Sequence, residues 1–171
     1  VNNGVVAVPV LLSPGATGNQ AGFNLIGNPY PSAISADEFI LANIYGGTGI
    51  NQTLSGTLYF WTHKDNASVT NPGPEAYNYT VDDYAMYNLS GGIGTGVGTP
   101  SLSGSVKPSG YIGSGQGFFA GVAAAGIVTF NNSMRAGNLP NTQFFKTQSV
   151  KAKSKAIEKD RFWLNLQNAD G

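Results

Sequence analysis

The 171-residue chain contains no cysteine, only one histidine (His63) and few charged residues. The absence of cysteine excludes disulfide bridges, thiolate metal sites and a cysteine nucleophile. No apolar run approaches the roughly 18 residues that indicate a membrane-spanning helix, so we expect no membrane span. Charged residues make up 11% of the chain, against about 25% in a typical globular domain. Uncharged Asn, Ser and Thr side chains must therefore supply most of the surface polarity.

The few charges are unevenly distributed along the chain. Residues 1–145 carry six acidic and three basic side chains, whereas residues 146–171 carry three acidic and six basic ones. The basic run near the C-terminus has no interleaved aromatic residues, so it indicates a solvated linker and no nucleic-acid binding. Its lysines are Lys151, Lys153, Lys155 and Lys159.

Glycine is abundant, with 24 residues, and it punctuates many short apolar runs. This pattern predicts an all-β fold, an antiparallel β-sandwich of the jelly-roll or immunoglobulin-like kind, with long Gly- and Asn-rich loops. The predicted strands cover residues 5–12, 22–27, 57–62, 79–89, 111–112, 115–122 and 126–130. We expect the last two to form a hairpin, because Gly121 and Gly126 supply turn geometry.

One short helix is predicted from residue 35 onward. Ser35 and Glu38 have the spacing of a capping box, and Asp37 and Glu38 suit the positive end of a helix dipole. Glycines 46 and 47 end the helix. The expected core includes one apolar face of each element, with Leu25, Ile26, Phe39, Leu58, Phe60, Phe118, Val128 and Phe130.

Composition divides the chain into three parts: a sandwich module over residues 1–146, a Lys-rich linker over 147–160 and an isolated strand over 161–171. A lone strand is not stable in water. We therefore expect it to pair with the body of the module, with another chain or with a further domain. The side chains available for that pairing are Phe162, Trp163, Leu164 and Leu166.

Three stretches, residues 22–34, 115–120 and 128–135, resemble a β-rich module common near the C-termini of Bacteroidota proteins that the type IX secretion system exports. Residues 161–171 are similar to the first strand of the type C sorting domain of such proteins. The resemblance implies an extracellular or outer-surface location, with the secretion machinery as a partner of the C-terminal region. Because the chain begins at Val1 and includes only one strand of the sorting domain, we expect it to be part of a longer protein.

The first of these stretches contains Asn28-Pro29-Tyr30-Pro31. The two prolines fix two φ angles, and the Asn side chain can cap local amides, so we interpret the motif as a rigid corner. In the second stretch, Gly115 and Gly117 flank Gln116, which predicts a positive φ or a close backbone approach and a buried glutamine that binds loop amides. The alternative is that these residues form the rim of a binding site.

Nothing in the sequence favours catalysis. No nucleophile-elbow motif surrounds any serine, so we expect the single histidine, His63, to be an ordinary strand-end or loop residue and not part of a catalytic triad. Asp82 and Asp83 would point to opposite faces of a strand, so they do not form a pair of catalytic acids. We therefore predict that the chain is not an enzyme.

We predict no cofactor, with a structural calcium ion as the alternative. The candidate ligands are acids in or beside a carbonyl-rich loop, namely Asp65, Glu75, Asp82 and Asp83, with Asn66 beside them. No EF-hand spacing is present.

Aromatic residues provide the candidate ligand site. Strand alternation places Tyr59 and Trp61 on one face and Phe60 on the other, and Tyr84 is a third candidate. The function that we favour is a non-catalytic structural or surface module of an exported protein. Two alternatives stay open: a carbohydrate-binding or adhesin module that uses this aromatic face, and a fibre subunit in which residues 162–167 add to a neighbour's sheet.

Overall fold

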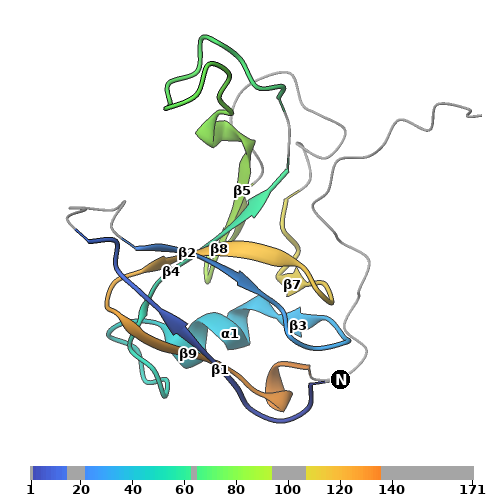
Figure 1. The fold of residues 1–171 in the computed structure, drawn as a ribbon. Coiled ribbons are helices and arrows are strands. Elements are labelled where there is room, and N and C mark those ends of the chain that lie inside the picture. The colour runs from blue at the N-terminus through green and yellow to red at the C-terminus, as the bar shows by residue number, and fades with distance from the viewer. Residues whose placement is uncertain (1, 15–21, 63–64, 94–106, 136–171) are drawn as a thin grey trace, which may run out of the picture.

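The computed structural model describes residues 2–14, 22–62, 65–93 and 107–135. These residues form mainly β-structure around one α-helix (Figure 1). The strands are β1 (Val6–Val10), β2 (Phe23–Gly27), β3 (Ile34–Ser35), β4 (Leu54–Trp61), β5 (Tyr84–Asn88), β6 (Gly91–Ile93), β7 (Tyr111–Ile112), β8 (Gly117–Val122) and β9 (Gly126–Phe130). Helix α1 spans Ala36–Asn43, and two 3₁₀ helices, η2 (Val81–Asp83) and η3 (Asn132–Arg135), precede β5 and follow β9.

The strands form three antiparallel sheets. The largest has five strands in the order β2-β8-β4-β5-β6, and the other two are the pairs β1-β9 and β3-β7. Figure 1 shows α1 between the five-stranded sheet and the β1-β9 pair. The ring of Phe39 on α1 packs against two other rings: its centre lies 5.5 Å from that of Phe118 on β8 and 4.6 Å from that of Phe130 on β9. The prediction of an antiparallel β-fold with one short helix is confirmed.

The core lies on the inner face of the five-stranded sheet, and seven of the eight predicted core residues are buried in it: Ile26, Phe39, Leu58, Phe60, Phe118, Val128 and Phe130. The eighth prediction, Leu25, is wrong, because this side chain is 68% exposed. Consecutive residues of a strand point to opposite faces, so Ile26 and Leu25 cannot share one core.

The predicted hairpin between residues 115–122 and 126–130 is also wrong. Strand β8 already has neighbours on both sides, β2 and β4, so β9 has no free edge of β8 to join and pairs with β1 instead. Thr53 marks the crossing, because its carbonyl accepts hydrogen bonds from Ala123 N at 2.7 Å and Ala124 N at 3.3 Å. The short link between β8 and β9 therefore connects two sheets.

Helix α1 begins as predicted. Ser35 is the N-cap, and its Oγ accepts a hydrogen bond from Glu38 N at 3.2 Å. Near the helix end, the buried Asn43 accepts from Thr129 N at 2.8 Å and donates to Thr129 O at 3.1 Å. This side chain thus pairs with β9 as a strand would, and it covers the edge that β1 leaves open.

The segment before β5 differs from the prediction of a strand over residues 79–89. The strand begins at Tyr84, and η2 replaces its first half, so Asp82 and Asp83 do not alternate across a sheet. Strand β4 begins earlier than predicted, at Leu54, and β1 ends earlier, at Val10. No helix of the described ranges is long and apolar enough to cross a membrane.

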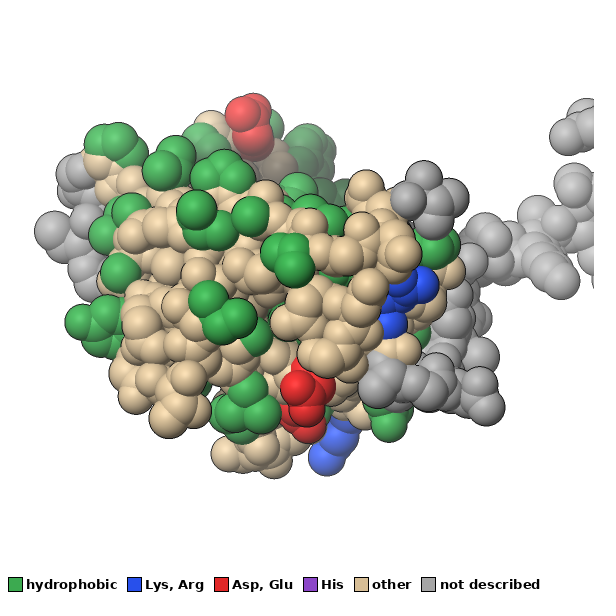
Figure 2. Space-filling view, turned by 90° about the horizontal axis from the view of Figure 1, so that it is seen from below, with side chains coloured by type: hydrophobic (Ala, Val, Ile, Leu, Met, Phe, Trp, Pro, Cys, Tyr) green, Lys and Arg blue, Asp and Glu red, His purple; other side chains and the backbone are tan. Residues whose placement is uncertain are grey.

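The surface agrees with the low charge content of the sequence. Figure 2 shows few acidic or basic side chains on the face that it presents, where hydrophobic side chains and uncharged atoms prevail. The predicted linker (147–160) and terminal strand (161–171) lie outside the described residues, as does His63.

Candidate functional site

The three stretches that carry the family resemblance meet at one place, which we call the motif corner and define by Asn28, Tyr30, Ser114 and Arg135. Asn28 is only 4% exposed. Its Nδ2 donates to the carbonyls of Ser32 (2.8 Å), Ile112 (3.1 Å) and Gly113 (3.0 Å), and its Oδ1 accepts from Tyr30 N at 3.0 Å. The prediction that this asparagine caps local amides is confirmed, and it also joins the first stretch to the loop before the second.

Tyr30 and Arg135 close the motif corner. The Tyr30 hydroxyl donates to Gly4 O at 2.5 Å, and the backbone carbonyl of Tyr30 accepts from Ser114 Oγ at 2.9 Å. The Arg135 guanidinium lies 5.0 Å from the centre of the Tyr30 ring, and its Nε donates to Ser32 Oγ at 3.0 Å. Burial raises the pKa of Tyr30, and the charge of Arg135 acts in the opposite direction.

Gln116 contributes to the motif corner through its backbone. Its carbonyl accepts from Asn28 N at 3.1 Å, while its half-buried side chain donates to Gly117 O at 2.9 Å. The expectation of a buried glutamine is therefore wrong, whereas the predicted positive φ is found at Gly115 (+70°). The motif corner is a set of polar groups that bond to one another. This arrangement favours the interpretation as a rigid corner over the interpretation as the rim of a binding site.

Apolar side chains, and not bonded polar groups, dominate the outer face, which we define as the side of the five-stranded sheet turned away from the core. A row of apolar side chains in register crosses four strands there: Leu25 (β2), Phe119 (β8), Tyr59 (β4) and Met86 (β5). Phe23 adds a ring contact with Tyr59 at 5.2 Å. Outward-facing apolar side chains on neighbouring strands form a continuous surface.

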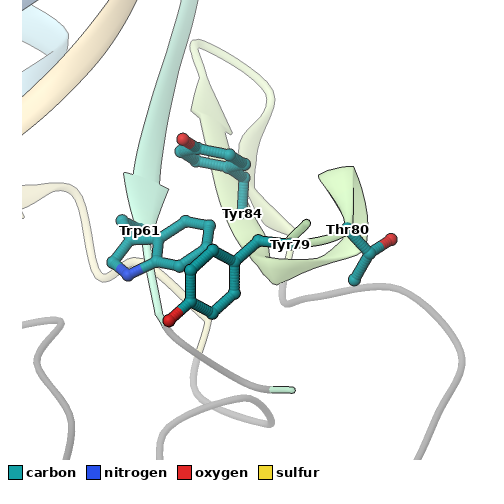
Figure 3. A pocket seen from close by; sticks show the side chains of 4 residues that line it. All are labelled: Trp61, Tyr79, Thr80 and Tyr84. Carbon is teal, nitrogen blue, oxygen red and sulfur yellow. The ribbon is translucent and has the colours of Figure 1, made fainter. Parts of the chain in front are cut away.

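At the end of this face, Trp61, Tyr79, Thr80 and Tyr84 line a hollow of about 370 Å³ (Figure 3). The Trp61 ring lies 5.0 Å from the ring of Tyr79, at an interplanar angle of 87°. It also lies 5.0 Å from the ring of Tyr84, at 64°. Three rings inclined in this way are the walls of a hollow and not one flat platform.

Local structure explains how these side chains meet. Trp61 is the last residue of β4 and faces outward by alternation, and its partner in register on β5 is Tyr84. Helix η2 turns the chain just before β5, with Asp83 N donating to Thr80 O at 3.2 Å. That turn brings Tyr79 and Thr80 to the ring of Trp61.

Asp83 lies between the residues of the hollow in sequence, but its side chain is completely buried. Its Oδ1 accepts from Asp65 N at 2.7 Å, and its carbonyl accepts from Thr62 N at 2.9 Å. Its Oδ2 has no hydrogen-bond partner among the described residues. Burial, and then the charge of Asp83, raise the pKa of Tyr84.

The predicted site residues are thus partly brought together. Tyr59, Trp61 and Tyr84 share the outer face, which confirms the expected alternation, although Thr80 was missed because only the η2 turn places it there. Of the calcium candidates, Asp65 and Asp83 are in contact, Asp82 is exposed, and Glu75 N donates to Asn78 Oδ1. The described residues contain no group of three or more His, Asp or Glu side chains that could hold a metal ion. The predicted partner residues Phe162, Trp163, Leu164 and Leu166 lie outside the described residues.

A family model matches residues 1–171, the whole chain. The chain belongs to the family DUF8693, a domain of unknown function. No curated protein and no solved structure matches it. Because the description of DUF8693 names no activity, the function has to be argued from the outer face and its hollow.

Proposed function

We propose that this DUF8693 chain is a non-catalytic surface module of an exported bacterial protein, and that its hollow binds carbohydrate. The observation that carries the proposal is the meeting of Trp61, Tyr79 and Tyr84 around a hollow of about 370 Å³. Binding sites for small molecules are typically concave, lined by aromatic side chains and supplied with a few polar groups. The hollow has this composition, because two tyrosine hydroxyls and the Thr80 hydroxyl accompany three aromatic rings.

Sugar rings fit such a site for a simple reason. They expose apolar C–H faces, which pack on aromatic rings, and hydroxyls, which need hydrogen-bond partners. The apolar row of Leu25, Phe119, Tyr59 and Met86 crosses the sheet beside the hollow, and the ring of Phe119 lies 5.8 Å from the ring of Tyr84. We propose that this row supports further units of a longer glycan.

The proposed architecture is a β-sandwich of the jelly-roll or immunoglobulin-like kind, in which the β1-β9 pair and α1 form the layer opposite the five-stranded sheet. The shared contacts of Phe39 with Phe118 and Phe130 support it. Export by the type IX system and an outer-surface location rest on the resemblance of residues 22–34, 115–120 and 128–135. Full-length protein should reach the surface or medium of its host, and a host without the type IX machinery should retain it.

A glycan array with purified protein tests the binding function. We expect binding to at least one class of polysaccharide, and loss of that binding in Trp61→Ala with the circular dichroism spectrum unchanged. Tyr45→Ala is the matched control, because Tyr45 is an exposed aromatic residue whose N–H bonds to Leu54 at the other end of β4, roughly 20 Å from Trp61. Binding that survives Trp61→Ala, or an array with no bound glycan, would overturn the proposal.

A further inference from the structure

The hollow has the geometry of an aromatic cage. Trp61 meets Tyr79 and Tyr84 at steep angles, 87° and 64°, so a ligand group inside is contacted from several sides. The faces of aromatic rings carry negative electrostatic potential, and cages of two or three rings are a common way to bind an ammonium group. A flat crystalline polysaccharide surface could not lie on all three rings at once.

The charges near the cage have one sign. Among the described residues between 65 and 84, every charged side chain is acidic, at Asp65, Glu75, Asp82 and Asp83. The described basic side chains lie elsewhere. Arg135 belongs to the motif corner, and Lys107 precedes Pro108, whose carbonyl lies against Gly92 of β6. Among the described residues, the segment that supplies Tyr79 and Tyr84 therefore carries only negative charge.

Asp83 is the acid whose charge acts on a ring of the cage, because it adds to the effect of burial in raising the pKa of Tyr84. It precedes Tyr84 of the cage, it is fully buried, and its Oδ2 has no hydrogen-bond partner among the described residues. A buried carboxylate with an unpaired oxygen is costly unless a positive charge lies close to it. Its interaction with a nearby cation is only weakly screened, since the intervening layer is protein and not water.

Building on the proposed carbohydrate-binding function, we propose that the hollow selects sugars that carry a free, protonated amino group. The ammonium group would lie in the hollow against the rings of Trp61, Tyr79 and Tyr84, and the carboxylate of Asp83, the residue before Tyr84, would supply the compensating charge. Neutral sugars of the same size would gain the ring contacts but not the electrostatic attraction.

The test compares two matched ligands by isothermal titration calorimetry: glucosamine oligomers, which are cationic, and N-acetylglucosamine oligomers of the same length, which are neutral. We expect the intact protein to bind the cationic oligomers at least about tenfold more tightly at low salt. This preference should shrink as ionic strength rises, because salt screens the attraction.

Two variants separate the roles of charge and rings. Asp83→Asn keeps an oxygen to accept the Asp65 N–H and replaces the other carboxylate oxygen with a neutral amide group. The preference for cationic oligomers should then disappear while neutral oligomers bind as before. Asp82→Asn is the control, because it removes an exposed charge one residue away and should leave most of the preference intact. Trp61→Ala should abolish binding of both ligands.

The outcomes are distinguishable. If neutral oligomers bind as tightly as cationic ones and Trp61→Ala abolishes both, the inference falls and the carbohydrate function stands. If neither ligand binds and the glycan array is empty, both fall. If calcium raises the melting temperature of the intact protein but not of Asp83→Asn, and glucosamine oligomers do not bind, a metal ion neutralises Asp83 and the inference is overturned. The salt titration of the intact protein decides the question even where Asp83→Asn does not fold.

Discussion

The motif corner and the hollow both combine aromatic rings with a buried polar side chain, yet they treat that side chain in opposite ways. In the motif corner, Asn28 uses its oxygen and both amide hydrogens in four hydrogen bonds. Next to Tyr84 of the hollow in sequence, Asp83 is more deeply buried but leaves Oδ2 without a partner among the described residues. The Tyr30 ring is covered, whereas Tyr79 is 48% exposed.

Under the proposed function, this difference separates residues that maintain the fold from residues that would contact a ligand. A polar group that is satisfied inside the protein contributes to stability and has little left to offer a partner. A buried group that lacks a partner costs stability and persists where binding repays the cost. The motif that makes the sequence recognisable is thus the structural half of the molecule, and the less conspicuous segment from Trp61 to Tyr84 is the half to test for function.

The largest effect should come from placing a charge in the motif corner. Asn28→Asp replaces the Nδ2 donor with an oxygen that faces the carbonyls of Ser32, Ile112 and Gly113. We expect a loss of about 4 kcal/mol in the free energy of unfolding, measured by urea denaturation, because Oδ1 keeps the Tyr30 N–H but the second oxygen of the buried charge faces only acceptors. In the control, Asn24→Asp, the side chain is more exposed and bonds only to Leu11, so the loss should be about 1 kcal/mol. Equal losses would show that the motif corner has no special role.

The next effect appears at alkaline pH on the inner face of β5. Tyr87 donates to Asp37 Oδ1 at 2.8 Å, and burial, followed by this hydrogen bond and the charge of Asp37, raises the pKa of Tyr87 to about 12. Since the folded pKa exceeds the unfolded value of about 10, this stabilisation is complete below pH 10 and is lost as the pH rises toward 12.

The measurement is the difference in unfolding free energy between the intact protein and Tyr87→Phe, taken from pH 8 to pH 12. We expect the difference to shrink by about 2 kcal/mol over this range, because phenylalanine has no proton to lose. Tyr84→Phe, on the outward face of the same strand, is the control and should change the alkaline slope less. If the unfolding free energy of Tyr87→Phe fell with pH as steeply as that of the intact protein, the raised pKa of Tyr87 would be contradicted.

Features that depend on local periodicity could be predicted from the sequence. Alternation alone puts Phe60 in the core and Trp61 on the outer face, and capping chemistry alone starts α1 after Ser35. Alternation also shows why the prediction for Leu25 was wrong: β2 has a single buried position, and Ile26 occupies it.

Features that depend on pairing between distant strands could not be predicted. The sequence separates β8 and β9 by only three residues, and nothing local shows that β2 and β4 already occupy both edges of β8. The hollow has the same origin, since it needs the register of Trp61 with Tyr84 and the turn of η2. The burial of Asp83 likewise follows from η2, where a continued strand was expected.

A smaller effect of opposite sign should follow the reverse exchange, from Asp to Asn, at position 83. Asp83→Asn removes a buried charge whose Oδ2 has no hydrogen-bond partner among the described residues, and it keeps the acceptor for Asp65 N, so we expect the free energy of unfolding to rise by about 1 kcal/mol without ligand. Thermal and urea unfolding at low calcium would measure it. A loss of stability instead would mean that the carboxylate is already compensated, and the contrast with Asn28 would disappear.

The smallest effect belongs to the outer face away from the hollow. Leu25→Ala should change the free energy of unfolding by less than about 0.5 kcal/mol, because the side chain is mostly exposed and leaves no cavity. Its neighbour provides the contrast: Ile26→Ala should cost about 3 kcal/mol, as expected for a buried aliphatic side chain. If Leu25→Ala also weakens binding to long glycans but not to short ones, the apolar row takes part in binding. If Leu25→Ala instead lowers the free energy of unfolding as much as Ile26→Ala does, this face is covered in the folded protein and cannot serve as a binding surface.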